Sequence, residues 1–124
     1  MRIATLLVSF TILIALLYPG EDLPDVRIGN WDKVIHLVMF ATWTVAVRYD
    51  WRQVRFPLWR MLLFGACFAV VTEVLQTLVE GRSFDPIDWA ADLAGVFVGW
   101  IISRPVIAST DRFLNYLFNR SARH

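Results

Sequence analysis

The feature that most constrains the fold is the grouping of apolar residues into four long blocks, separated by short polar stretches. The blocks cover residues 3–18, 31–49, 58–79 and 87–103. At a rise of about 1.5 Å per residue, helices of about 17 to 22 residues extend ~26 to 33 Å, close to the ~30 Å hydrocarbon core of a bilayer. The sequence therefore predicts an all-α fold, a four-helix transmembrane bundle.

Composition excludes several other classes of protein. Hydrophobic residues make up 57% of the 124-residue chain, too many for a soluble enzyme of this size. A net charge of +1 provides no basic excess for binding nucleic acid, and no low-complexity tract suggests disorder. Cys67 is the one cysteine, so neither a disulfide nor a cysteine-based metal site is expected. The first block lacks a small-x-small cleavage site, so we expect a retained helix instead of a signal peptide.

The distribution of basic residues predicts how the helices cross the membrane. Nine of the twelve lie at the N-terminus, around the second loop or in the tail: Arg2, Arg48, Arg52, Arg55, Arg60, Arg104, Arg112, Arg120 and Arg123. The first and third loops hold the other three: Arg27, Lys33 and Arg82. By the positive-inside rule, both termini are expected to be cytoplasmic and the first and third loops external.

The chain after Pro105 differs from the four blocks. Its apolar residues recur at helical spacing with charged residues opposite, at positions 106, 107, 110, 113, 114, 117 and 118. We expect a short amphipathic helix lying on the inner leaflet. The predicted organisation is a four-helix membrane domain over 1–104 and a cytoplasmic amphipathic tail over 105–124.

Ionisable residues inside apolar spans are rare because burying a charge in a bilayer costs at least about 2.5 kcal/mol. Here they form three helical stripes, all near the predicted outer surface. The stripes and the loop beside them contain Asp32, His36, Glu73, Gln76, Arg82, Asp85, Asp88 and Asp92. Because short-looped helices must pack together, we expect the stripes to face one another and to form a polar, substrate-binding pocket that opens outward.

Several of these residues are also open to purely structural interpretations. Asp32 lies where it can cap the second helix, and Asp85 before Pro86 is a typical N-cap. His36 can be a packed histidine with satisfied hydrogen bonds. A loop ion-pair set accounts equally well for Arg82, Asp85 and Asp88. The small residues Ala91, Gly95 and Gly99, spaced by four, predict a close-packing seam between helices.

Glu73 and Asp92 are harder to explain structurally, because they lie too deep to cap a helix. With His36 they are the candidates for a general acid or base, since carboxylates held close together in low dielectric cannot all ionise. We assign no catalytic residue from this pattern, and whether the protein is an enzyme stays open. No cofactor is expected, although a divalent metal ion held by His36, Glu73, Asp88 and Asp92 is an alternative.

The order of these motifs resembles one known family. Asp32-Lys33-x-x-His36, Glu73-x-x-Gln76, and then Arg82, Asp85, Asp88, Asp92 and Gly95 resemble the VanZ-like family of small bacterial membrane proteins over about residues 30 to 100. The resemblance implies a protein of the bacterial cytoplasmic (inner) membrane, and the founding member is associated with resistance to the glycopeptide teicoplanin. Phe40 stands where many members have Tyr, and Asp92 stands where many have Asn.

Two hypotheses for function follow. In the first, the pocket binds or chemically alters a cell-envelope or lipid-linked substrate, such as a cell-wall precursor, with Arg82 holding an anionic headgroup. In the second, the polar residues only hold the helices of a structural or regulatory membrane protein together. Membrane lipids are expected partners in both, and nucleic acid is not. An ion path is less favoured because the inner half of the spans has no matching ionisable stripe.

Overall fold

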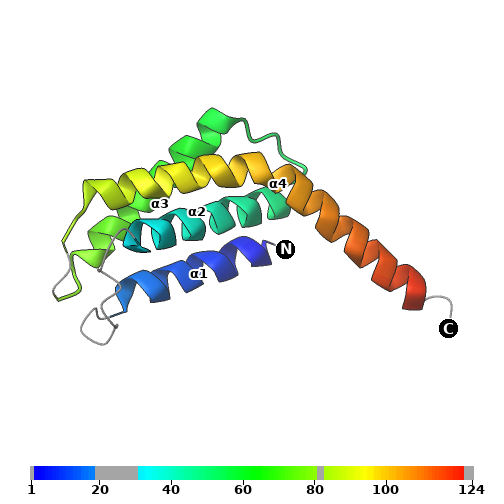
Figure 1. The fold of residues 1–124 in the computed structure, drawn as a ribbon, viewed down its shortest axis with the longest axis horizontal. Helices are drawn as coiled ribbons and strands as arrows, with labels where there is room; N and C mark the ends of the chain where they lie inside the picture. Colours follow the sequence, from blue (N-terminus) through cyan, green and yellow to red (C-terminus); the bar gives the residue numbers. More distant parts are fainter. Residues whose placement is uncertain (1, 19–30, 81–82, 122–124) are drawn as a thin grey trace.

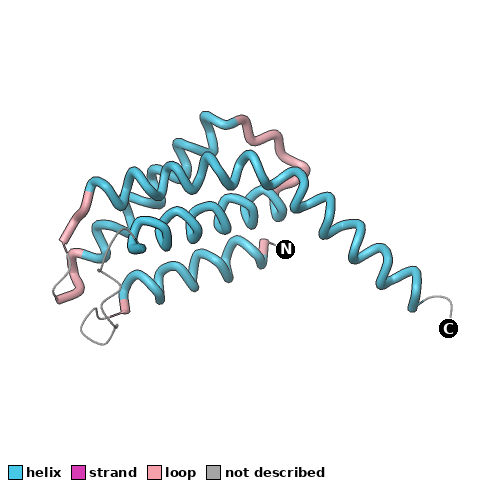
Figure 2. The backbone as a smooth tube through the Cα atoms, viewed as in Figure 1, coloured by secondary structure: helices cyan, strands magenta, loops and turns pink. Residues whose placement is uncertain are grey.

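A computed structural model describes residues 2–18, 31–80 and 83–121 of the chain. The described residues form four α-helices joined by loops and contain no strand (Figures 1 and 2). The helices are α1 (Ile3–Leu17), α2 (Trp31–Asp50), α3 (Leu58–Gln76) and α4 (Pro86–Ser121). The all-α prediction is confirmed, and the first three helices begin where the apolar blocks begin.

The boundaries of α3 and α4 follow from local chemistry. Pro57, which favours extended backbone, immediately precedes α3. Helix α3 ends at Gln76, three residues before the predicted end of the block at 79, and Thr77 and the residues after it form turns. Asp85 caps α4, because its Oδ1 accepts a hydrogen bond from the Ile87 N–H at 2.8 Å with Pro86 as the first helical residue.

The chain after Pro105 does not form a separate short helix. It continues α4, which is 36 residues long and contains Pro105 in its interior. Proline removes one backbone hydrogen bond and tends to bend a helix without necessarily ending it. In Figure 1 the last part of α4 (orange to red) leaves the bundle at an angle. The separate short helix expected after Pro105 is therefore the last part of α4, while its place on the inner leaflet stays a prediction.

Helices α2 and α4 pack along each other over the longest stretch and form the centre of the fold. Helix α1 packs mainly on α2, and α3 mainly on α4. The close approach depends on glycine: a Cβ at Gly95 would collide with the Leu37 carbonyl oxygen, and one at Gly99 would lie 2.5 Å from the Ala41 carbonyl oxygen. The seam predicted at these glycines is confirmed as the contact between α4 and α2.

Aromatic residues fill the centre of the core. Phe40 and Trp43 of α2 are buried and contact Phe68 of α3, whose ring stacks on Trp43 with centroids 5.0 Å apart. The Trp43 Nε1–H donates to the Ser9 Oγ of α1 at 3.0 Å. One tryptophan thus ties α1, α2 and α3 together.

Two helices, α3 and α4, are long and apolar enough to cross a membrane. Helix α1 is apolar but has 15 residues, which extend about 22 Å at 1.5 Å per residue. Helix α2 has charged residues near both ends, among them Lys33 and Arg48. Large apolar side chains are exposed on every helix, as expected for contact with lipid: Leu6, Leu7, Phe10, Val38, Leu63, Phe64, Val71, Phe97 and Ile101. These features indicate a membrane protein, while four crossings stay a prediction.

Candidate functional site

A polar cluster lies at one end of the bundle, where α2 and α4 begin and α3 ends. Helices α2 and α4 run side by side there, so the residues of their first turns face one another (Figure 1). The close contact at Gly95 holds α4 against α2 one turn below these polar residues. The cluster consists of Asp32, Lys33, His36, Glu73, Gln76, Asp85, Asp88 and Asp92.

Lys33 partly neutralises the outer part of this polar cluster. Its Nζ donates to the Asp85 Oδ2 at 2.9 Å and to the Asp88 Oδ1 at 2.5 Å, and the Asp32 Oδ2 lies 3.6 Å away. The hydrogen bond from Lys33 holds the pKa of the Asp85 carboxyl below its ordinary value. One ammonium group therefore forms ion pairs with three carboxylates and links α2 to the start of α4.

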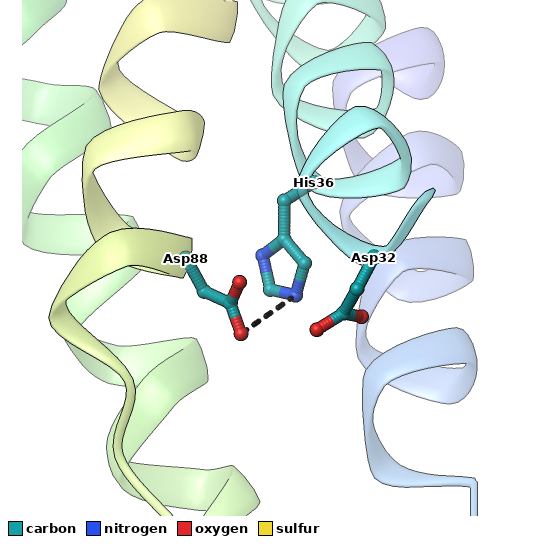
Figure 3. Close-up of side chains that lie close together, drawn as sticks. All are labelled: Asp32, His36 and Asp88. Atoms are coloured by element: carbon teal, nitrogen blue, oxygen red, sulfur yellow. Dashed lines mark ion pairs between the residues drawn. The ribbon is translucent and has the colours of Figure 1, made fainter. Parts of the chain in front are cut away.

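His36 lies between the outer and the inner part of the polar cluster. Its side chain is 1% exposed, and its Nδ1 is 2.8 Å from the Oδ1 of Asp92, which is fully buried. On the other side of the ring, Nε2 is 3.9 Å from the Asp88 Oδ2, and Asp32 lies beside it (Figure 3). The imidazole can thus exchange a proton directly with Asp92, and its other nitrogen can share a ligand with Asp32 and Asp88.

Glu73 brings α3 into the polar cluster. Its side chain is 1% exposed, and its Oε2 accepts a hydrogen bond from the Asp85 N–H at 3.2 Å. Within the described chain, the Glu73 Oε1 and the Asp92 Oδ2 are buried and have no hydrogen-bond partner. Native proteins pair nearly all such atoms, so two unpaired carboxylate oxygens in one cluster require an explanation. Gln76 points elsewhere, because its amide donates to the Leu16 carbonyl of α1 at 3.4 Å.

Two groups of three side chains in the polar cluster have the geometry to hold a metal ion, and they share His36. The outer group is Asp32, His36 and Asp88, and the inner group is His36, Glu73 and Asp92. In each group one ligand atom per residue lies within 4.8 Å of the others. All four residues predicted from the sequence to hold a divalent ion fall in these groups, together with Asp32.

Comparison with known families gives an independent result. The family model for VanZ/LLP1 matches residues 3–108, which is most of the chain. The chain belongs to the VanZ/LLP1 family. No curated protein and no solved structure matches this VanZ/LLP1 protein significantly. The resemblance suggested by the spacing of the polar motifs is therefore confirmed.

Phe40 and Asp92, the two positions expected from the resemblance to differ from many members, are both buried in this VanZ/LLP1 protein. Phe40 is fully buried in the aromatic core, with its ring centroid 6.2 Å from that of Trp43. Asp92 has the most buried carboxylate of the polar cluster and is paired with His36. Phe40 therefore contributes to the apolar core, and Asp92 contributes a fully buried acid to the cluster.

Most of the predicted site residues do come together. Helices α2, α3 and α4 bring Asp32, His36, Glu73, Asp85, Asp88 and Asp92 to one end, and Gln76 lies at the same end but faces α1. Arg82 lies outside the described residues. Lys33 was not among the predicted site residues, although it stands in the Asp32-Lys33-x-x-His36 motif. Its position one residue after Asp32 and three before His36 places it at the same helix end, and that spacing was the available signal.

Proposed function

We propose that this VanZ/LLP1 protein is a multi-pass protein of the bacterial cytoplasmic membrane, and that its polar cluster binds the headgroup of a lipid-linked envelope substrate at the outer surface. The observation that carries the proposal is the buried trio of His36, Glu73 and Asp92, contributed by three helices and containing two carboxylate oxygens without partners among the described residues. A structural network gains little from such unpaired atoms, whereas a ligand would pair them.

The opposite end of the bundle supports the proposed orientation. Arginines there lie over tryptophan rings, with the Arg2 Cζ 3.4 Å from the Trp51 ring centroid and the Arg60 Cζ 5.0 Å from the Trp59 ring centroid. Arginine and tryptophan together are typical of a membrane interface, and an arginine excess is typical of the cytoplasmic side. The polar cluster would then face outward. Reporter fusions test this: a fluorescent protein fused after His124 should be active, and alkaline phosphatase fused there should be inactive.

The groups in the polar cluster suit hydrogen bonding to a polar headgroup and transfer of a proton. Lys33 provides a cation at the entrance, although three carboxylates share it. His36 lies between an outer acid, Asp88, and the inner acid Asp92, so a proton can move between the two sides of the ring. In this proposal Glu73, Asp92 and His36 are the candidates for the general acid and base. A link to teicoplanin susceptibility would follow if the substrate were a cell-wall precursor.

Mass spectrometry of bound lipids tests the proposal. Wild-type protein purified in mild detergent should carry a lipid or lipid-linked precursor that is absent from Glu73→Gln, a substitution that keeps the side-chain volume. Asp111→Asn is the matched control, because Asp111 is an exposed acid that pairs with Arg52 in the part of α4 beyond Pro105. Equal lipid content in wild type, Glu73→Gln and Asp111→Asn would contradict the proposal.

The alternative function is structural, and one observation favours it. Lys33 and His36 of α2 are both paired with aspartates of α4, so these contacts join the two central helices. Interhelical polar contacts of this kind stabilise membrane proteins by about 0.6 to 2 kcal/mol each. Under this alternative, variants of the polar cluster lose co-purified lipid only in proportion to their loss of folded protein. Under the ligand-binding proposal, Glu73→Gln loses the co-purified lipid while the amount of protein in the membrane is unchanged.

A further inference from the structure

The inner and outer parts of the polar cluster differ in how their charge is balanced. The outer carboxylates Asp85 and Asp88 accept hydrogen bonds from Lys33, which supplies a full positive charge. The inner carboxylates Glu73 and Asp92 have no lysine or arginine partner among the described residues. Among the described residues, the imidazole of His36 is therefore the one basic group beside these two buried acids.

The atoms without partners lie in this same inner part. The Glu73 Oε1 and the Asp92 Oδ2 are buried without a hydrogen-bond partner in the described chain, and both residues are at most 1% exposed. One ligand atom from each of His36, Glu73 and Asp92 lies within 4.8 Å of the other two. Ligands in one metal coordination sphere lie about 3 Å apart, since each is roughly 2.0–2.2 Å from the ion. Small side-chain rotations would close this set around an ion.

We propose that His36, Glu73 and Asp92 bind one divalent cation of the first transition row, Zn²⁺ or Mn²⁺, with one ligand from each of the helices α2, α3 and α4. The charge of a divalent cation balances the charges of the two carboxylates, and the unpaired oxygens gain a partner by binding the ion. One imidazole nitrogen with carboxylate oxygens suits these ions better than Mg²⁺ or Ca²⁺, which prefer oxygen ligands alone.

The surroundings of His36 support this role. Its Nδ1 faces the inner acids and is hydrogen-bonded to the Asp92 Oδ1 at 2.8 Å, so Nδ1 would bind the ion in place of that hydrogen bond. Nε2 then carries the ring proton and points toward the Asp88 carboxylate, 3.9 Å away. A carboxylate behind a metal-binding histidine fixes its tautomer and its orientation. When Nδ1 carries a proton in the metal-free protein, its N–H donates to the Asp92 carboxylate. Binding of the ion through Nδ1 then releases this proton.

This inference deepens the proposed function and rests on it for one point, the location of the ion beside a substrate headgroup. There the cation would attract anionic oxygens of the substrate. The test measures only the metal bound per chain. Protein purified without chelator, and chelator-treated protein dialysed against Zn²⁺ or Mn²⁺, should contain one equivalent of metal per chain by mass spectrometry. Glu73→Gln should weaken binding at least tenfold, and Asp111→Asn should leave it unchanged.

A second variant separates the inner group from the outer one. Asp88 belongs only to the outer group, so Asp88→Asn should change metal affinity less than Glu73→Gln does. Circular dichroism of each metal-free variant checks that it is folded. Absence of bound Zn²⁺ and Mn²⁺ from folded wild type, or a larger loss in Asp88→Asn than in Glu73→Gln, overturns the proposed metal site. Metal binding without any co-purified lipid would instead refute the proposed function and leave the metal site intact.

Discussion

Replacing Gly95 by alanine tests how the contact between α2 and α4 positions the polar cluster. The added Cβ would collide with the Leu37 carbonyl oxygen and would lie 3.0 Å from the Phe40 Cβ. An ordinary carbon–oxygen contact is about 3.3–3.6 Å, so the two helices must separate by about 1 Å at this point. His36 neighbours Leu37, and Asp92 lies one turn before Gly95. The same shift would therefore lengthen the Nδ1–Oδ1 distance of 2.8 Å beyond hydrogen-bonding range.

The expected loss of stability is that of an overpacked core, about 1–3 kcal/mol. For a chain of this size, each kcal/mol lowers the melting temperature by roughly 4 °C. Thermal unfolding of purified protein in detergent measures the change. Gly65→Ala is the comparison variant, because its Cβ would meet a side-chain methyl group, the Val96 Cγ2, whereas the Cβ at Gly95 would meet a backbone oxygen that moves only with its helix. A melting temperature of Gly95→Ala equal to or above that of Gly65→Ala would refute this account of the interface.

Three further predictions concern Lys33 and Pro105. Lys33→Met should destabilise the protein by about 1–3 kcal/mol in thermal unfolding, because Lys33 is 27% exposed and its loss leaves Asp85 and Asp88 without a cation. Arg52→Met, which removes an exposed pair, should change stability by less than ~1 kcal/mol, and equal losses in the two variants would contradict the assignment. Because Lys33 lowers the pKa of Asp85 in the folded protein, the stability from this pair is present above the ordinary pKa of 3.8 and is lost as the pH falls through the lowered value. Unfolding followed across acid pH should show a larger loss in wild type than in Lys33→Met, in which the Ile87 N–H still donates to Asp85. Pro105→Ala should restore a backbone hydrogen bond and straighten α4. Pulsed electron paramagnetic resonance would detect the straightening as a longer distance between spin labels on either side of the bend. An unchanged distance would show that Pro105 does not cause the bend.

Helix number and most helix ends were predictable from the sequence, because they depend on local patterns. The apolar blocks fix the four helices, and the Asp85-Pro86 pair fixes the start of α4. The continuity of α4 through Pro105 was not predictable by the same means. A proline in a helix interior loses one hydrogen bond, and whether the helix resumes depends on the residues on both sides, which here are helix-compatible.

The membership of the polar cluster was largely predictable, but its internal pairing was not. Three polar stripes at the same end of short-looped helices must meet, which places His36, Glu73 and Asp92 together. Which acid pairs with His36 depends on the rotation and the axial shift of α2 against α4. The rotation and the axial shift depend on how the backbone of α2 packs against Gly95 and Gly99 of α4, which is a property of the tertiary structure. The role of Lys33 depends on the reach of its long side chain across to α4.

The thermal stability of metal-free Glu73→Gln tests most directly whether the polar cluster serves a ligand. Glu73 is a buried carboxylate that accepts one backbone hydrogen bond from Asp85 and leaves Oε1 without a partner in the described chain. A neutral amide removes a buried charge and can still accept that hydrogen bond. If the cluster is a ligand site, metal-free Glu73→Gln should melt at the temperature of metal-free wild type or above it and should no longer retain lipid. A melting temperature several degrees below that of metal-free wild type would show that Glu73 holds the helices together, and would contradict the proposed ligand site.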